Sequence, residues 1–157
     1  MESQYLDDNE IEQMTTFDPK IIAWSDRFKI GFSMVDQHHK KLFHIAKKLQ
    51  KSIVSKFTTP EKIKKIAVEL RNYSVYHFAT EEEIMQSYGC PYYEKHKKEH
   101  STFIRTIENA FPDLIHGDLS AREKVYSFLI NWLVVHVINS DKQWADWIRA
   151  NSPEAIR

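Results

Sequence analysis

The feature that most limits the fold of this chain is its shortage of residues that interrupt regular structure. The 157 residues include only three glycines and five prolines. Few tight turns can therefore form, and long helices are expected. The length suits one domain with a single buried core. Lys plus Arg equals Asp plus Glu at 22 each, so net charge favours neither nucleic acid nor an anionic membrane as a partner.

Four stretches place apolar residues at the spacing of an amphipathic helix. Their expected ranges are 33–53, 60–88, 92–111 and 125–150. The first helix should begin near Ser33 or Asp36. Thr59 is expected to cap the second helix, Pro112 to end the third, and a capping box that starts at Ser120 to open the fourth.

Helices joined by connections of a few residues pack most simply as antiparallel neighbours. We therefore expect an all-α fold, an antiparallel up-down-up-down four-helix bundle with an N-terminal arm. Residues 1–20 should form the arm, which is partly flexible, and residues 21–157 the bundle domain. The apolar side chains expected to pack across the bundle ahead of the first helix are Trp24, Phe28, Ile30 and Phe32.

Polar side chains that can bind metal interrupt the apolar face of every expected helix. Burial of unpaired imidazoles and carboxylates costs about a few kcal/mol each or more, so a set of them in one core needs compensation. Metal ions bind these groups directly and provide it. The candidate ligands on the apolar faces are His39, His77, Glu81, His96, His100 and His136. The histidines expected to be solvated, because they lie off these faces or in a connection, are His38, His44 and His116.

The number of imidazoles indicates more than one metal ion. Five exceed what one tetrahedral zinc ion can use, and carboxylates can bridge two ions. Ferritin-like di-iron sites use Glu-x-x-His motifs, and this chain contains none. A dinuclear site with more nitrogen ligands is therefore predicted.

Several segments of the chain together match the pattern of a known family. These segments are Trp24 with residues 29–32, residues 36–42, residues 77–82, the pair His96 and His100, and residues 132–137 followed by Asp141. They closely resemble the hemerythrins, in particular the bacterial ones. The resemblance covers residues 24 to about 148, and seven ligand positions match in type, order and spacing.

The resemblance implies two iron ions, bridged by an oxo or hydroxo group and by the carboxylates of Glu81 and Asp141. One iron would be completed by the three histidines His96, His100 and His136. The other would be bound by His39 and His77, and would keep one position open. Dioxygen is expected to bind at this open position.

The residues expected to line the oxygen pocket are Leu133, Trp132 and Phe78. Such a pocket is dry and offers no general acid that could cleave the O–O bond, so it favours reversible binding over chemistry. The same side chains are also suited to plain core packing.

The spacing between His136 and Asp141 is unusual for two ligands on one helix. Five residues turn the second side chain about 140° from the first in a regular α-helix. Either Asp141 reaches the site from one side, or a local π-type bulge realigns it, as is common at functional sites.

The expected function is reversible binding of dioxygen for storage, delivery or sensing, without catalysis. The chief alternative is a di-iron oxidoreductase, such as a peroxide or nitric oxide scavenger, and a third is a bundle with structural metal such as zinc. The expected partners are dioxygen and an unidentified oxygen-consuming protein, with no nucleic acid and no membrane. The single cysteine, Cys90, and the lack of a signal-like or membrane-spanning segment predict a cytoplasmic location.

Overall fold

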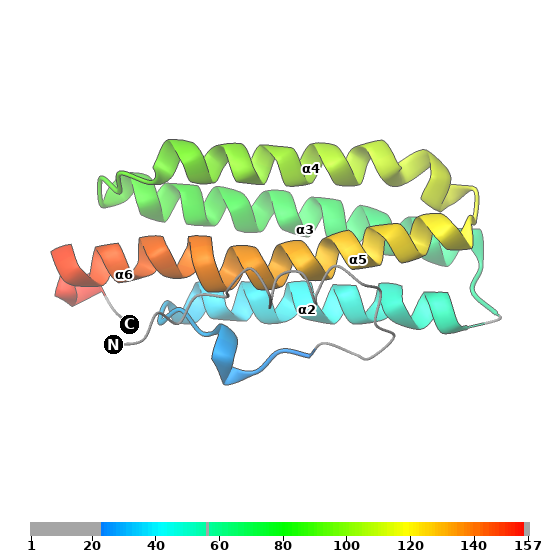
Figure 1. The fold of residues 1–157 in the computed structure, drawn as a ribbon, viewed down its shortest axis with the longest axis horizontal. Coiled ribbons are helices and arrows are strands. Elements are labelled where there is room, and N and C mark those ends of the chain that lie inside the picture. Colours follow the sequence, from blue (N-terminus) through cyan, green and yellow to red (C-terminus); the bar gives the residue numbers. More distant parts are fainter. Residues whose placement is uncertain (1–22, 56, 156–157) are drawn as a thin grey trace.

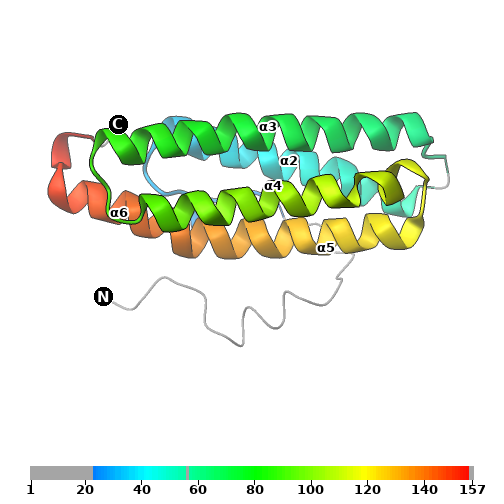
Figure 2. The same ribbon diagram turned by 90° about the horizontal axis from the view of Figure 1, so that it is seen from above.

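The computed structural model describes residues 23–55 and 57–155, which contain helices and no β-strand. Four long helical rods form the fold (Figures 1 and 2). Three of them are α2 Ser33–Val54, α3 Pro60–Ser87 and α4 Tyr93–Ile115. The fourth is continuous and consists of α5 Leu119–Val135, η2 His136–Asp141 and α6 Lys142–Asn151. The short helical turns η1 Asp26–Phe28 and η3 Pro153–Ala155 precede and follow these rods.

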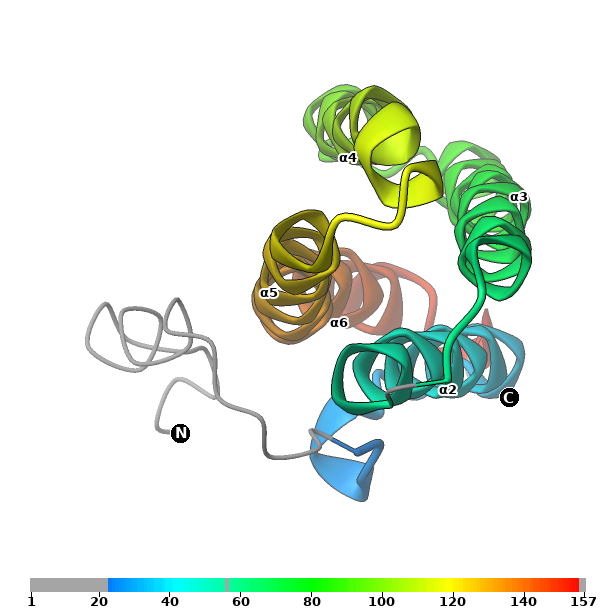
Figure 3. The same ribbon diagram turned by 90° about the vertical axis from the view of Figure 1, so that its right-hand side faces the viewer.

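Successive rods run in opposite directions along the long axis of the bundle (Figure 1). They close into a ring, in which α2 contacts α3, α3 contacts α4, α4 contacts α5, and α5 contacts α2. Figure 3 looks along the bundle and shows the four rods around a common interior. The predicted antiparallel four-helix bundle is therefore confirmed. Among the described helices, none has both the length and the apolar character needed to cross a membrane.

Both ends of α3 follow the expected local chemistry. The Thr59 side chain accepts a hydrogen bond from the Lys62 backbone N–H at 3.2 Å, and Pro60 occupies the first helical position. At the other end Gly89 adopts a positive φ of 64°, and the Cys90 N–H donates to the Met85 carbonyl at 2.9 Å. This is a Schellman-type end, which satisfies carbonyls that the helix leaves unpaired.

Two predicted helix boundaries were wrong. Pro112 does not end the third helix, because α4 continues to Ile115. In the last turn, a proline removes only one of the remaining hydrogen bonds, so the helix tolerates it. Ser120 is not the cap of the fourth helix. The cap is Asp118, whose carboxylate accepts from the Ser120 N–H at 2.9 Å, and Ser120 lies inside the helix.

The segment 23–32 packs against the outside of α2 (Figure 3). Phe28, Ile30 and Phe32 are buried as predicted, and Trp24 is partly buried against the same core. The Phe28 ring lies 4.7 Å from that of Phe43 on α2. The apolar side chains of this segment therefore extend the bundle core. Residues 1–22 lie outside the described residues, so the flexibility of the arm and its boundary stay predictions.

Two polar side chains, one on α2 and one on α6, hold this segment through three hydrogen bonds. Asp36 on α2 accepts hydrogen bonds from the backbone N–H groups of Ile30 at 2.8 Å and Gly31 at 3.4 Å. Arg149 on α6 donates to the Ile30 carbonyl at 2.6 Å. Gly31 has a φ of 91°, and a Cβ there would clash with the Arg149 guanidinium. Glycine at this position is thus required twice, by the backbone and by the close approach of Arg149.

We predict that Gly31→Ala lowers the free energy of unfolding by about 1 to 3 kcal/mol, because it adds backbone strain and displaces Arg149 from its carbonyl partner. Thermal and urea unfolding measure the loss. Gly89→Ala is the matched control, since Gly89 also has positive φ but has no atom within 4 Å of an added Cβ. Equal losses in the two variants would show that the contact with Arg149 is unimportant.

Candidate metal centre

The structure brings all seven predicted metal ligands together inside the bundle. Each rod contributes: α2 carries one ligand, α3 two, α4 two, and the fourth rod two. These residues are His39, His77, Glu81, His96, His100, His136 and Asp141, and none is more than 4% exposed. All five histidines direct Nε2 toward the two carboxylates.

A π-helix resolves the spacing problem in the fourth rod. Residues His136–Asp141 form η2, a π-helix whose wider turn brings side chains five residues apart to one side of the rod. His136 Nε2 then lies 3.1 Å from an oxygen of Asp141. Of the two alternatives that the sequence left open, the structure has the local π-type bulge.

Glu81 lies between two groups of histidines. Its Oε1 is 3.0 Å from His39 Nε2 and 2.9 Å from His77 Nε2. Its Oε2 is 3.0 Å from His96 Nε2 and 3.1 Å from His100 Nε2. Each carboxylate oxygen therefore faces a different group.

Asp141 repeats this division. Its Oδ2 is 3.0 Å from His39 Nε2, whereas its Oδ1 is 2.9 Å from His96 Nε2 and 3.1 Å from His136 Nε2. Two sets of convergent donor atoms result, and they share Glu81 and Asp141. We call the histidines of one set the three-histidine group (His96, His100 and His136) and those of the other set the two-histidine group (His39 and His77).

The donor atoms fit two metal ions. Bonds of about 2.1 Å from a transition metal to N and O place neighbouring ligands of an octahedron about 3.0 Å apart, which agrees with the separations of 2.9 to 3.1 Å. His100 Nε2, His136 Nε2 and Asp141 Oδ2 are buried and make no hydrogen bond. Buried polar atoms need partners, and metal ions on the shared carboxylates would satisfy all three.

Burial and charge give the ligands unequal pKa values in the absence of metal. Burial opposes a charge on His39, but the adjacent carboxylates of Asp141 and Glu81 outweigh it and raise the His39 pKa to about 9. The same balance raises the pKa of His96 to about 10. Burial lowers the pKa of His77 to about 4 despite the nearby Glu81. The surrounding histidines hold the pKa values of Glu81 and Asp141 well below their usual range, although burial raises them.

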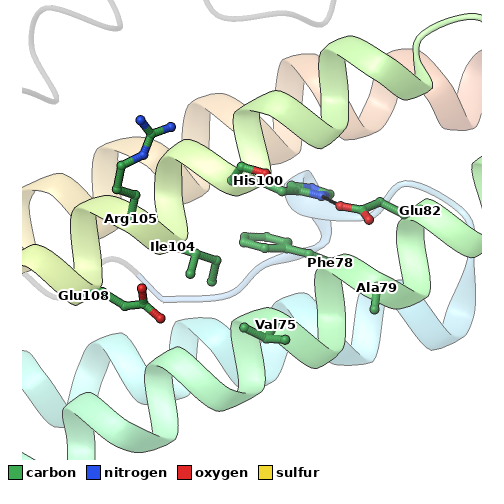
Figure 4. A pocket seen from close by; sticks show the side chains of 9 residues that line it. Val75, Phe78, Ala79, Glu82, His100, Ile104, Arg105 and Glu108 are labelled. Atoms are coloured by element: carbon green, nitrogen blue, oxygen red, sulfur yellow. Dashed lines mark hydrogen bonds and ion pairs between the residues drawn. The ribbon is translucent and has the colours of Figure 1, made fainter.

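Three outer side chains that we did not predict hold the predicted ligands in place. Glu82 accepts from His100 Nδ1 at 2.9 Å (Figure 4), and Glu99 lies 2.9 Å from His136 Nδ1. The Trp144 indole N–H donates to Asp141 Oδ1 at 3.2 Å. Such partners fix the orientation of metal ligands and raise their basicity. A sequence signal existed for the two acids, because each directly neighbours a ligand residue in the chain.

His38 is not solvated, which corrects our expectation. It is only 7% exposed, and its Nδ1 lies 3.2 Å from Nδ1 of His77. Position 38 is turned away from the bundle axis, yet it faces the neighbouring helix α3 rather than water. His44 and His116 are exposed as predicted.

Two of the residues predicted to line an oxygen pocket cover the three-histidine group. The Phe78 ring stacks on His100 at 3.9 Å and 7°, and the Trp132 ring stacks on His136 at 4.0 Å and 13°. Leu133 is buried. Phe78 also lines an outer pocket of about 380 Å³ between α3 and α4, and the His100 ring on which it stacks lines the same pocket (Figure 4). The oxygen-pocket role of these three residues stays a prediction.

Comparison with known proteins agrees with this geometry. The sequence model of a family described as "Hemerythrin HHE cation binding domain" matches residues 30–148. The chain belongs to the hemerythrin family. A hemerythrin domain binds a di-iron centre, and hemerythrins are non-haem iron proteins that bind dioxygen.

Bacterial and animal hemerythrins are both similar to this chain. The bacteriohemerythrin of Clostridium acetobutylicum is 30% identical over 129 residues, which cover 80% of this chain and 100% of the relative. The bacteriohemerythrin of Stenotrophomonas maltophilia is 26% identical over 87% of this chain and 88% of its own length. The myohemerythrin of Theromyzon tessulatum is 28% identical over 78% of this chain and 90% of its own length.

We predict that metal loading of the metal-free protein at pH 7 releases protons. His39 and His96, with pKa values of about 9 and about 10, then carry protons that must leave before Nε2 can bind metal, so roughly two protons per chain should appear. Apparent metal affinity should rise from pH 6 toward pH 9, because fewer protons compete. Calorimetric titration with zinc in buffers of different ionisation heat measures the count. Release of no proton would contradict the protonated state of these two rings.

Proposed function

We propose that this hemerythrin binds dioxygen reversibly at a di-iron centre, for storage, delivery or sensing of oxygen. In this proposal the three-histidine group holds one iron, the two-histidine group holds the other, and Glu81 and Asp141 bridge them. The observation that carries the proposal is the unequal division of histidines around two shared carboxylates. One set offers five donor residues and the other only four.

A ferrous pair held by these residues would supply two electrons and, on the side with fewer protein donors, a place for dioxygen to bind. The protein residues determine where that position lies. Glu81 and Asp141 each direct one oxygen to each group, so both groups receive the same number of carboxylate donors. The difference of one histidine therefore leaves the two-histidine side as the side with space for a ligand.

The outer carboxylates favour binding over cleavage of the O–O bond. Glu82 and Glu99 both hydrogen-bond to rings of the three-histidine group, on the side away from the proposed oxygen position. The pKa of Glu99 is lowered, because the contact with His136 outweighs burial, so this side chain stays ionised. An ionised carboxylate cannot act as a general acid. We further propose a cytoplasmic setting, which suits the single cysteine, with an oxygen-consuming protein as recipient.

The decisive experiment is a cycle of reduction, oxygenation and deoxygenation of the purified protein. The reduced protein is prepared without oxygen, air is admitted, the visible spectrum is recorded, and oxygen is then removed. We expect a colour that appears with oxygen and disappears without it. Irreversible oxidation with turnover of peroxide would instead indicate an oxidoreductase, and a colourless protein would indicate a structural metal.

Replacement of a proposed ligand should remove iron. We predict that His77→Ala and Glu81→Ala each lower the iron content below two per chain, with the larger loss for Glu81→Ala, because Glu81 serves both sets. Iron analysis of the purified variants measures this. His44→Ala, an exposed histidine on α2, is the control and should retain two. Two full iron equivalents in both ligand variants would contradict the assignment.

The Phe78 ring should protect the centre from water. We predict that Phe78→Ala lowers stability by about 3 to 5 kcal/mol and speeds irreversible oxidation of the oxygenated protein, because loss of the ring would uncover the face of His100 on which it stacks and widen the outer pocket between α3 and α4. Val75→Ala is the matched control, since Val75 lines the same pocket but is 40% exposed. Oxidation rates equal to that of the unaltered protein would show that Phe78 is not a barrier.

A further inference from the structure

His38 contacts a proposed metal ligand from a neighbouring helix. It is carried by α2, whereas His77 is carried by α3, and their rings meet edge to face with centroids 5.3 Å apart. The two Nδ1 atoms are 3.2 Å apart, a hydrogen-bond distance, in a buried environment. This is the outer hydrogen bond of the two-histidine group, where the three-histidine group has Glu82 and Glu99.

The chemistry of the His77 ring decides the direction of this hydrogen bond. His77 Nε2 lies 2.9 Å from Glu81 Oε1 and points into the centre. A ring nitrogen that binds metal carries no proton, so the proton of His77 must be on Nδ1. That N–H donates to Nδ1 of His38. His38 therefore accepts through a bare Nδ1 and carries its own proton on Nε2.

Aromatic side chains of α3 hold His38 in this position. The Tyr76 ring lies 5.1 Å from the His38 ring, and the Tyr73 ring lies 5.8 Å away at an interplanar angle of 72°. These rings approach His38 from the same helix that carries His77. Packing against these rings thus fixes the His38 ring beside His77, with Nδ1 in position to accept the hydrogen bond.

We propose that His38 is a positioning residue for His77, which fixes the ring so that Nε2 faces the metal and thereby sets the affinity of the two-histidine group for its ion. The inference rests on the proposed ligand role of His77. This role of His38 also makes the two-histidine group chemically different from the three-histidine group. Carboxylates support His100 and His136, whereas a neutral imidazole, a weaker acceptor, supports His77. The two-histidine group is therefore the weaker metal site.

The first test uses the full chain loaded with zinc, which is redox-inert, and removal of zinc by a chromogenic chelator. The unaltered protein should hold two zinc ions, one more tightly than the other. His38→Leu should weaken the looser ion by about 10 to 100-fold and leave the tighter one unchanged. His38→Gln, which keeps an acceptor, should restore most of the affinity. His44→Leu is the matched control on the same helix and should have no effect.

The second test needs no variant and so does not depend on the folding of one. Nitrogen-15 NMR of the zinc-loaded protein reports which ring nitrogen carries the proton. We expect His77 to be protonated at Nδ1, and His38 to be protonated at Nε2 alone. A proton on Nδ1 of His38 would overturn the proposal, because that nitrogen could not then accept.

The outcomes separate this inference from the proposed function. Fewer than two zinc ions in the unaltered protein would overturn the ligand assignment, and the His38 inference with it. If the unaltered protein binds two ions and His38→Leu binds both with the same affinities as the unaltered protein, the His38 inference alone would be overturned. Loss of both ions to the same extent in His38→Leu, without rescue in His38→Gln, would indicate a general packing role and would also overturn it.

Discussion

The structure depends on the burial of two carboxylates in a helical core. Glu81 and Asp141 have no exposed surface, and a buried carboxylate without compensation costs several kcal/mol. Five histidine rings and the Trp144 N–H surround them. Because these partners come from every rod, the four rods must be aligned along the bundle axis so that all of them reach the two carboxylates. The π-helix at His136–Asp141 follows from the same requirement, since a regular helix would turn Asp141 away.

The asymmetry of the centre extends from the ligands to their surroundings. The three-histidine group has carboxylate partners and aromatic rings stacked on two of its imidazoles. The two-histidine group has one fewer donor and a neutral partner, His38. The first arrangement suits a firmly held ion, and the second suits an ion that can accept a further ligand. The difference in ligand number and the difference in outer partners therefore have the same consequence.

The sequence predicted the helices and the inward position of the candidate ligands because helical periodicity governs both. Positions four residues apart share a face, so the His77 and Glu81 pair could be placed inside without a structure. The position of His38 could not be predicted in this way. A side chain one residue away from a ligand turns by about 100°, and periodicity alone does not say whether a neighbouring helix or water lies there. Asp118 took the role predicted for Ser120 because either residue can cap a helix, and only the backbone path decides between them.

The most direct test of the account is a crystal structure of the iron-loaded protein with anomalous data at the iron absorption edge. Two peaks are expected, both beside Glu81 and Asp141. One should lie about 2.1 Å from Nε2 of His96, His100 and His136, and the other about 2.1 Å from Nε2 of His39 and His77. A single peak, or two peaks with the histidines divided in another way, would contradict the three-to-two arrangement from which the proposed oxygen binding follows.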